Sequence, residues 1–165
     1  MDKGISIWVG LDVHKESITI ALARQGREPA QFVGEIGHDV NKLLKRLRAL
    51  GDPAQIHVVY EAGPTGYGLQ RKLNESGFEC EIIAPSLVPQ LVGSRVKTDR
   101  RDCMRLVHLS RAGELQPIWI PSVDDQAIRD LSRAREDAVE ARTRARHQLR
   151  GFLLRHDMRY PGETA

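Results

Sequence analysis

The chain begins with segments in which apolar and polar positions alternate, which is the pattern of half-buried β-strands. Residues 5–12 (ISIWVGLD) and 17–23 (SITIALA) alternate clearly, and residues 31–36 (QFVGEI) alternate more weakly. The VHKE link between the first two segments suits a hairpin. We therefore predict three strands that follow one another in an antiparallel meander.

After the third strand, the spacing of the apolar residues changes to that of a helix. Residues 39–50 place their apolar side chains in one stripe, and Gly51 and Pro53 then end the helix. The same reasoning from periodicity and turn residues predicts the later elements. In chain order they are a strand at 56–60, a helix at about 66–76, a strand at 78–84, a loop over 85–98 and a helix over 99–112.

Three antiparallel strands followed by two crossovers that add parallel strands are the element order of the ribonuclease-H-like fold. We therefore predict an α/β protein with a mixed sheet and flanking helices. Pro117 and Pro121 bracket a short extended segment, and Ser122 is a plausible N-terminal cap for a long polar helix. The predicted parts are an α/β domain at 1–115, a connector at 116–121, and the long helix with its tail at 122–165.

The composition is that of a globular protein, with 41% hydrophobic and 28% charged residues. No stretch approaches the roughly 18 consecutive apolar residues of a membrane span, and the N-terminus lacks the pattern of a signal peptide. We therefore predict a cytoplasmic protein without a membrane span. Cys80 and Cys103 show no metal-ligand spacing, and we interpret them as small core residues.

Four acidic residues lie where the predicted topology would bring them together. Asp12 ends the first strand, and Glu61 follows the fourth strand, which neighbours the first in the predicted sheet. Asp99 and Asp102 are three residues apart at the start of a helix, so they share one face, which continues into Leu106. Each acid alone has a simpler interpretation, as a turn former, a solvated loop residue or a partner of the helix dipole. Their joint occurrence in this order favours convergence.

Converging carboxylates repel one another unless cations compensate their charge. Hard oxygen ligands suit Mg²⁺ or Mn²⁺, and two such ions can stabilise the attacking and leaving oxygens of a phosphodiester displacement. We therefore predict Mg²⁺ (or Mn²⁺) as cofactor. The predicted catalytic and metal-binding residues are Asp12, Glu61, Asp99 and Asp102.

Three motifs, GLDVHKESI, YEAGPTGYG and SRVKTDRRDC, occur in this order along the chain. Together they resemble the N-terminal half of RuvC-like, bridge-RNA-guided transposases of insertion sequences, over about residues 5–113 and more loosely in the following helix. The resemblance implies an Asp-Glu-Asp-Asp set on a ribonuclease-H-like fold. It also implies an enzyme that cleaves and transfers DNA strands during transposition, with DNA and a guide RNA as partners.

The resemblance also implies a second, C-terminal domain that supplies a catalytic serine, whereas this chain ends at Ala165. We interpret the chain as the N-terminal portion of such an enzyme, and we name no serine as a substitute. One alternative is a catalytically inert module that binds nucleic acid and dimerises. Another is half of an actin-like or sugar-kinase ATPase, but the chain is too short for the second lobe of that fold.

The net charge of +3 permits a nucleic-acid partner without requiring one. Basic residues gather around the second acid pair and in the second half of the long helix, where they could meet phosphates. A merely solvated helix face explains these clusters equally well. The predicted nucleic-acid-binding residues are Arg95, Lys97, Arg100, Arg101, Arg105, Arg142, Arg146 and Arg150.

The long helix carries an imperfect heptad pattern, which is typical of a short coiled coil. We predict that it pairs with a second copy, making a homo-oligomer; packing on its own domain is the alternative. Two further residues are minor candidates: His14 could assist proton transfer or hold a phosphate, and Tyr67 could stack on a base. A residue without such a role is the simpler interpretation of each. The heptad positions are Ile128, Leu131, Ala138, Ala145, Leu149 and Phe152, interrupted by Arg135 and Arg142.

Overall fold

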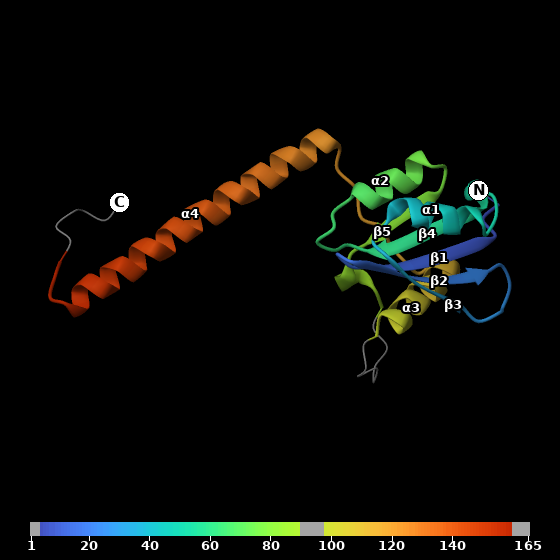
Figure 1. Cartoon of the computed structure of the whole chain (residues 1–165), viewed down its shortest axis with the longest axis horizontal. Helices are drawn as coiled ribbons and strands as arrows, with labels where there is room; N and C mark the ends of the chain where they lie inside the picture. Colours follow the sequence, from blue (N-terminus) through green and yellow to red (C-terminus); the bar gives the residue numbers. More distant parts are fainter. Residues whose placement is uncertain (1–3, 90–97, 160–165) are drawn as a thin grey trace. The chain divides into compact units, whose positions relative to one another are not determined.

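The computed structural model describes residues 4–89 and 98–159. The chain forms two compact units, Met1–Trp119 and Ile120–Ala165. The first unit contains a mixed sheet with helices, and the second contains one long helix (Figure 1). In chain order the strands and helices are β1 (Ile7–Val13), β2 (Ser17–Arg24), β3 (Gln31–Gly37), α1 (Val40–Arg48), β4 (Ile56–Glu61), α2 (Gly68–Glu75), β5 (Glu79–Ile83), α3 (Asp99–Ala112) and α4 (Val123–Arg155).

The five strands lie in the order β3-β2-β1-β4-β5. β1 and β3 are antiparallel to β2, whereas β4 is parallel to both β1 and β5. This arrangement confirms the predicted ribonuclease-H-like fold class. The last paired residues of β1 and β4 are Leu11 and Tyr60. Asp12 and Glu61 come next on their strands, so both lie at the same end of two neighbouring strands.

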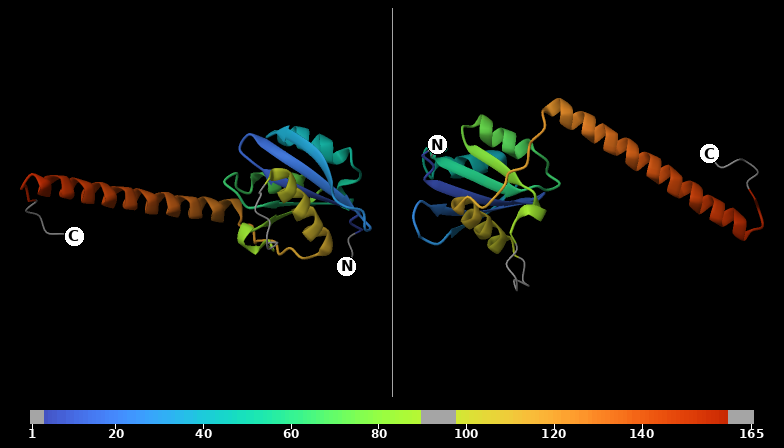
Figure 2. Two further views of the ribbon diagram at one scale, coloured as in Figure 1. Left: turned by 90° about the horizontal axis from the view of Figure 1, so that it is seen from below. Right: turned by 180° about the vertical axis from the view of Figure 1, so that it is seen from behind.

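Helices cover both faces of the sheet, with α1 and α2 on one face and α3 on the other (Figures 1 and 2). Because side chains alternate between the faces of a strand, the residues of β1 and β4 divide into two sets. Tyr60 belongs to the α2 face, where its hydroxyl accepts a hydrogen bond from the Gln70 backbone N–H at 3.1 Å. Val59 belongs to the α3 face, where it packs in a buried cluster with Leu106. Asp12 and Glu61 share this α3 face by the same alternation.

α3 approaches β1 most closely at Gly10. A Cβ atom at this position would lie 2.5 Å from the carbonyl oxygen of Cys103 and 2.7 Å from Cγ2 of Val107. Both of these α3 residues are fully buried, and they pack in one cluster with Ala21 and Ala23 of β2. Small residues on the sheet therefore allow the helix backbone to rest almost directly on the strands.

Both ends of α3 have clear signals in the sequence. Thr98 caps its N-terminus, since its Oγ1 accepts a hydrogen bond from the Arg101 backbone N–H at 3.3 Å. Gly113 ends the helix in the left-handed conformation with φ 72°. Near that end, the Arg111 guanidinium donates hydrogen bonds to the backbone carbonyls of Arg24 and Glu28, at 3.1 and 2.7 Å. These bonds hold α3 to the end of β2 and to the connection that follows it.

Two details differ from the sequence prediction. The second helix begins at Gly68 rather than at residue 66, because Gly66 is in the left-handed conformation with φ 68° and forms a turn. The segment predicted as a loop opens with a short 3-10 turn at Pro85–Leu87. Residues 90–97 of that segment lie outside the described residues. After α3 the chain runs along β5, where the Ile118 backbone N–H donates to the Ile82 carbonyl at 2.8 Å.

The long helix α4 has 33 residues and begins at the predicted cap. Ser122 Oγ accepts a hydrogen bond from the Asp125 backbone N–H at 3.1 Å and donates one to the Asp125 carboxylate at 2.8 Å. None of the residues of α4 is buried. Within the described part of the chain, no helix is both long enough and apolar enough to span a membrane.

The close contact at Gly10 yields the first prediction. Gly10→Ala should lower the free energy of unfolding by about 1–3 kcal/mol, because the added methyl group overpacks the contact between α3 and β1. Urea denaturation followed by circular dichroism measures this change. Gly68→Ala is the matched control, since a Cβ there meets no atom within 4 Å. Equal losses of stability in the two variants would argue against a steric limit at Gly10.

Candidate functional site

The structure brings the four predicted carboxylates together at one cavity of about 320 Å³. The cavity lies on the α3 face of the sheet, at the ends of β1 and β4 and beside the first turn of α3. Two apolar residues, Leu11 and Leu106, form part of its wall. The polar residues that line it are Asp12, His14, Glu61, Asp99 and Asp102.

Each carboxylate reaches the cavity for a local reason. Asp12 is the penultimate residue of β1, and Glu61 is the last residue of the neighbouring parallel strand β4. Asp99 and Asp102 both lie in the first turn of α3, whose start is fixed by the Thr98 cap. Three residues apart on a helix, they point from the same face. The contact of α3 with Gly10 then sets this face over the strand ends.

The surroundings of Asp12 in the cavity are electrostatically unfavourable for its charged form. Burial raises the pKa of the Asp12 carboxyl above its ordinary value of 3.8, and the negative charges of Asp99 and Asp102 raise it further, while His14 acts in the opposite direction. Oδ2 of Asp102 is buried and accepts no hydrogen bond from the described residues. A buried acceptor with no donor is uncommon in folded proteins. Among the described residues, Asp102 thus offers to the cavity a buried carboxylate oxygen that no hydrogen bond satisfies.

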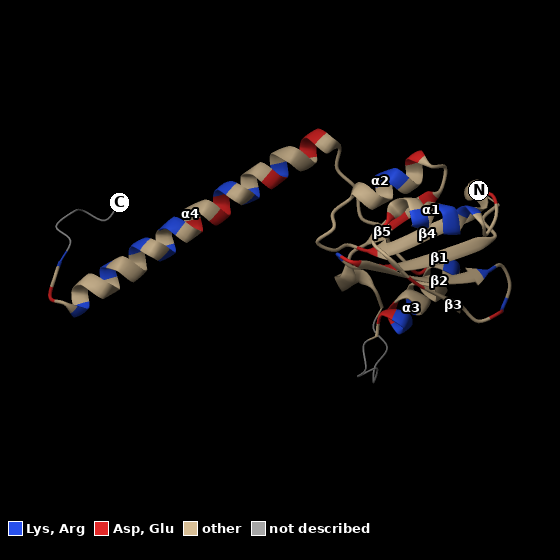
Figure 3. Cartoon of the chain, viewed as in Figure 1, with Lys and Arg blue, Asp and Glu red and all other residues tan. Residues whose placement is uncertain are grey.

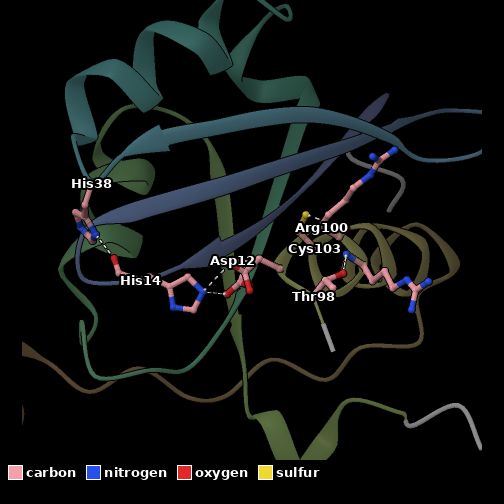
Figure 4. A network of polar contacts seen from close by, with 8 residues as sticks. Asp12, His14, His38, Thr98, Arg100 and Cys103 are labelled. Atoms are coloured by element: carbon pink, nitrogen blue, oxygen red, sulfur yellow. Dashed lines mark hydrogen bonds and ion pairs between the residues drawn. The ribbon is translucent and has the colours of Figure 1, made fainter. Parts of the chain in front are cut away.

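His14 lies inside this site, although the sequence favoured a turn residue without a functional role. Its Nε2 is 3.3 Å from Oδ1 of Asp12 (Figure 4). The same nitrogen is 3.6 Å from Oδ2 of Asp99. The side chain of Asp12 is 23% exposed, whereas those of His14 and Asp99 are 52% and 55% exposed. The position of His14 two residues after Asp12, in the hairpin turn, was the available signal.

His38 is a residue that the sequence analysis missed. Its Nδ1 donates a hydrogen bond of 2.6 Å to the backbone carbonyl of His14 (Figure 4). The two histidines are 24 residues apart in the chain. They meet because β3 ends beside the turn between β1 and β2, with Gly37 paired to Ser17. No local pattern indicates such a contact.

The predicted basic residues near the second acid pair have different surroundings. The guanidinium of Arg100 lies 5.0 Å from the ring centre of Phe32 on β3. Arg105 donates a long hydrogen bond of 3.5 Å to the Val88 carbonyl, and Arg101 is exposed. Arg95 and Lys97 lie outside the described residues.

The charge on α4 is divided along its length (Figure 3). The acidic residues of this helix all lie at or before Glu140, and every charged residue after it is an arginine. Arg146 and Arg150 line a groove of about 180 Å³ together with Leu149 and Leu153. The arginines of this half are Arg142, Arg144, Arg146, Arg150 and Arg155.

Comparisons with known proteins find relatives along nearly the whole chain. Residues 9–157 match the family model of DEDD transposases of the IS110 type, described as transposase. A Sinorhizobium fredii protein named as the transposase y4qE is 43% identical over 162 residues, covering 96% of this chain and 41% of that protein. The transposase for insertion sequence element IS1533 of Leptospira borgpetersenii is 35% identical over 157 residues, covering 93% of this chain and 45% of that protein. The chain thus spans less than half the length of these two relatives.

A comparison with solved structures finds RuvC of T. thermophilus in complex with a Holliday junction substrate. The alignment has a TM-score of 0.43 and 12% sequence identity, and it covers 68% of this chain and 99% of the RuvC chain.

The raised pKa of Asp12 yields a prediction about stability and pH. The folded chain binds this proton more tightly than the unfolded chain, so the charged carboxylate destabilises the fold above its raised pKa. The destabilisation should vanish as the pH falls below about 3.8, where the carboxyl is protonated in both states. In metal-free buffer, Asp12→Asn should therefore be more stable than the wild type at pH 7 and equal to it at low pH.

Urea denaturation at a series of pH values, with EDTA present, measures this difference. Glu114→Gln is the control, because it removes one exposed carboxylate just beyond the other end of α3. If Asp12→Asn and Glu114→Gln change the free energy of unfolding by the same amount at pH 7, the unfavourable surroundings of the charged Asp12 carboxylate are not the cause of the change.

Proposed function

Because the chain belongs to the family of DEDD transposases of the IS110 type, we propose that it carries the metal-dependent catalytic domain of a DNA transposase. In this role the domain cleaves a phosphodiester bond of DNA and takes part in transferring the strand. The observation that carries the proposal is the convergence of four carboxylates, from two strands and one helix, on one cavity. Their order along the chain, Asp-Glu-Asp-Asp, is also the order in the family name.

The cofactor we propose is Mg²⁺ or Mn²⁺, held by Asp12, Glu61, Asp99 and Asp102. The fit rests on the donor set, which offers hard oxygen atoms, and on the buried Oδ2 of Asp102 that accepts no hydrogen bond from the described residues. Bound divalent ions would supply charge compensation for the oxygens that attack and leave the phosphorus. The protein itself would hold these carboxylates in place through the packing of α3 on β1.

The proposed substrate is DNA, and the proposed second nucleic acid is a guide RNA. Arg101 is exposed in the first turn of α3, beside the carboxylates, and the second half of α4 has only arginines as charged residues. Such residues contact phosphates without reading sequence. Guidance by RNA rests on the resemblance of the three sequence motifs and is proposed on that basis.

Complete strand exchange is proposed for the whole-length protein and not for this chain by itself. The curated relatives are more than twice as long as the part that the chain matches. In the whole protein, the serine that the resemblance implies would act as nucleophile together with the carboxylate site. A module that binds metal and nucleic acid but does not cleave is the alternative for the 165-residue chain.

Metal binding and cleavage test this proposal directly. Isothermal titration should show that the chain binds Mn²⁺, and that Asp12→Ala and Asp102→Ala each weaken the affinity by about tenfold or more. Glu114→Ala should bind Mn²⁺ like the wild type. Circular dichroism checks that the variants remain folded. Equal Mn²⁺ affinity in the wild type and in Asp12→Ala would contradict the proposed site.

Incubation with branched DNA and Mg²⁺ then separates the two candidate roles. Cleavage that disappears in Asp12→Ala supports a catalytic domain that is active alone. Metal and DNA binding without cleavage supports a binding module that needs the rest of the protein.

We also propose that α4 mediates self-association. Its apolar heptad residues Ile128, Leu131, Leu149 and Phe152 are between 51% and 72% exposed. A long helix that buries none of its residues usually gains its stability from a partner surface. Arginines within the seam would weaken a dry interface, so a weak dimer is expected.

Leu149→Asp should therefore weaken self-association by about tenfold or more, since it places a charge in the proposed seam. Sedimentation equilibrium over a wide concentration range measures the dimer constant. Leu154→Asp is the matched control, because Leu154 is also on α4 and 61% exposed but lies outside the heptad positions. A wild-type chain that stays monomeric throughout, or equal effects of the two variants, would speak against pairing through this seam.

A further inference from the structure

His14 lines the cavity together with the four carboxylates, and a site built from carboxylates alone gives this histidine no role. One ligand atom from each of Asp12, His14 and Asp99 lies within 4.8 Å of the other two. The two acids come from different elements, β1 and α3. Nε2 of His14, in the turn between β1 and β2, lies near Asp12 (Figure 4) and also near Asp99. Among the described residues that line the cavity, His14 is the one whose side chain offers a nitrogen atom as a ligand.

We propose that His14 is a nitrogen ligand of the divalent metal ion held by Asp12 and Asp99, and that His38 positions it. The inference rests on the proposed function, because it takes the carboxylate cavity to be a metal site. It adds a residue of a different chemical type to the four acids. It also gives a function to the hydrogen bond between His38 and the His14 carbonyl.

The turn that carries His14 is fixed on both sides by backbone hydrogen bonds. The His14 N–H donates to the Ser17 carbonyl at 2.9 Å, and the His38 N–H donates to the Glu16 carbonyl at 2.9 Å. The bond from His38 Nδ1 to the His14 carbonyl adds a third tie at 2.6 Å. Since a carbonyl oxygen only accepts, Nδ1 of His38 carries the hydrogen. The backbone of His14 is thus held in place before any ion binds, which favours a defined ligand geometry.

A nitrogen ligand changes which ion the site prefers. Carboxylates alone suit Mg²⁺ and Mn²⁺, whereas an imidazole favours the transition-metal ion. The presence of His14 beside Asp12 and Asp99 therefore predicts a preference for Mn²⁺ over Mg²⁺. Removal of the imidazole should reduce this preference while the carboxylates still bind both ions.

Pulsed electron paramagnetic resonance of the Mn²⁺-loaded chain tests the ligand directly. The wild type should show the coupling of a ¹⁴N nucleus bound to Mn²⁺, and labelling the chain with ¹⁵N-histidine should replace it by the ¹⁵N pattern. His14→Ala should lose the coupling and bind Mn²⁺ about tenfold more weakly. His147→Ala, an exposed histidine on α4, is the matched control and should leave both readings unchanged.

Variants of His38 test separately whether this residue positions His14. His38→Ala should keep the fold but weaken Mn²⁺ binding and diminish the nitrogen coupling. His38→Asn, whose side-chain amide can donate to the same carbonyl, should restore both. If His38→Ala matches the wild type in affinity and coupling, the positioning role is wrong.

The outcomes separate this inference from the function on which it rests. Bound Mn²⁺ with carboxylate-dependent affinity but no nitrogen coupling in the wild type would overturn the role of His14 and leave the carboxylate site intact. A wild-type chain that binds no Mn²⁺ would overturn the proposed metal site itself. Nitrogen coupling that survives in His14→Ala would assign the ligand to another histidine and would also overturn the proposal.

Discussion

The direct contact of α3 with β1 at Gly10 is the constraint on which the rest of the site depends. Cys103, whose carbonyl would collide with a side chain at Gly10, follows Asp102 immediately in the sequence. Gly10 itself lies two residues before Asp12 on β1. The packing contact and the carboxylate site are therefore adjacent on both elements, and a shift of the helix would separate the acids. The small residues beneath α3 fix the spacing of the charged groups beside them.

This packing holds together charges that repel one another. Burial and the neighbouring acids raise the pKa of Asp12, and Oδ2 of Asp102 is buried without a hydrogen bond from the described residues. A fold selected only for stability would place neutral or apolar side chains at these positions. Unfavourable electrostatics of this kind, located in a cavity at the ends of parallel strands, are typical of a binding or catalytic site. Among the described residues that line the cavity, His14 is the one with a basic side chain.

Much of the fold and most of the site could be predicted from the sequence, because both follow local patterns. The alternation in residues 5–12 and 17–23 and the turn signals gave the strand order, and that order placed Asp12 beside Glu61. The helical spacing of Asp99 and Asp102 gave their common face. The features that could not be predicted depend on contacts between residues that are far apart in the sequence. His38 reaches His14 across 24 residues, and Phe32 meets Arg100 only through the packing of α3 near β3. The start of α2 was misplaced because Gly66 adopts a left-handed conformation that periodicity does not reveal.

We propose that the four carboxylates form one metal site because α3 rests on β1. Anomalous X-ray diffraction at the manganese edge, from crystals of the chain grown with Mn²⁺, tests it most directly. We expect an anomalous peak in the cavity, within coordination distance of carboxylate oxygens from both β1 and α3, and its loss in Asp12→Ala. Crystals with Mn²⁺ bound only elsewhere, or with no anomalous peak between Asp12 and Asp102, would contradict the account.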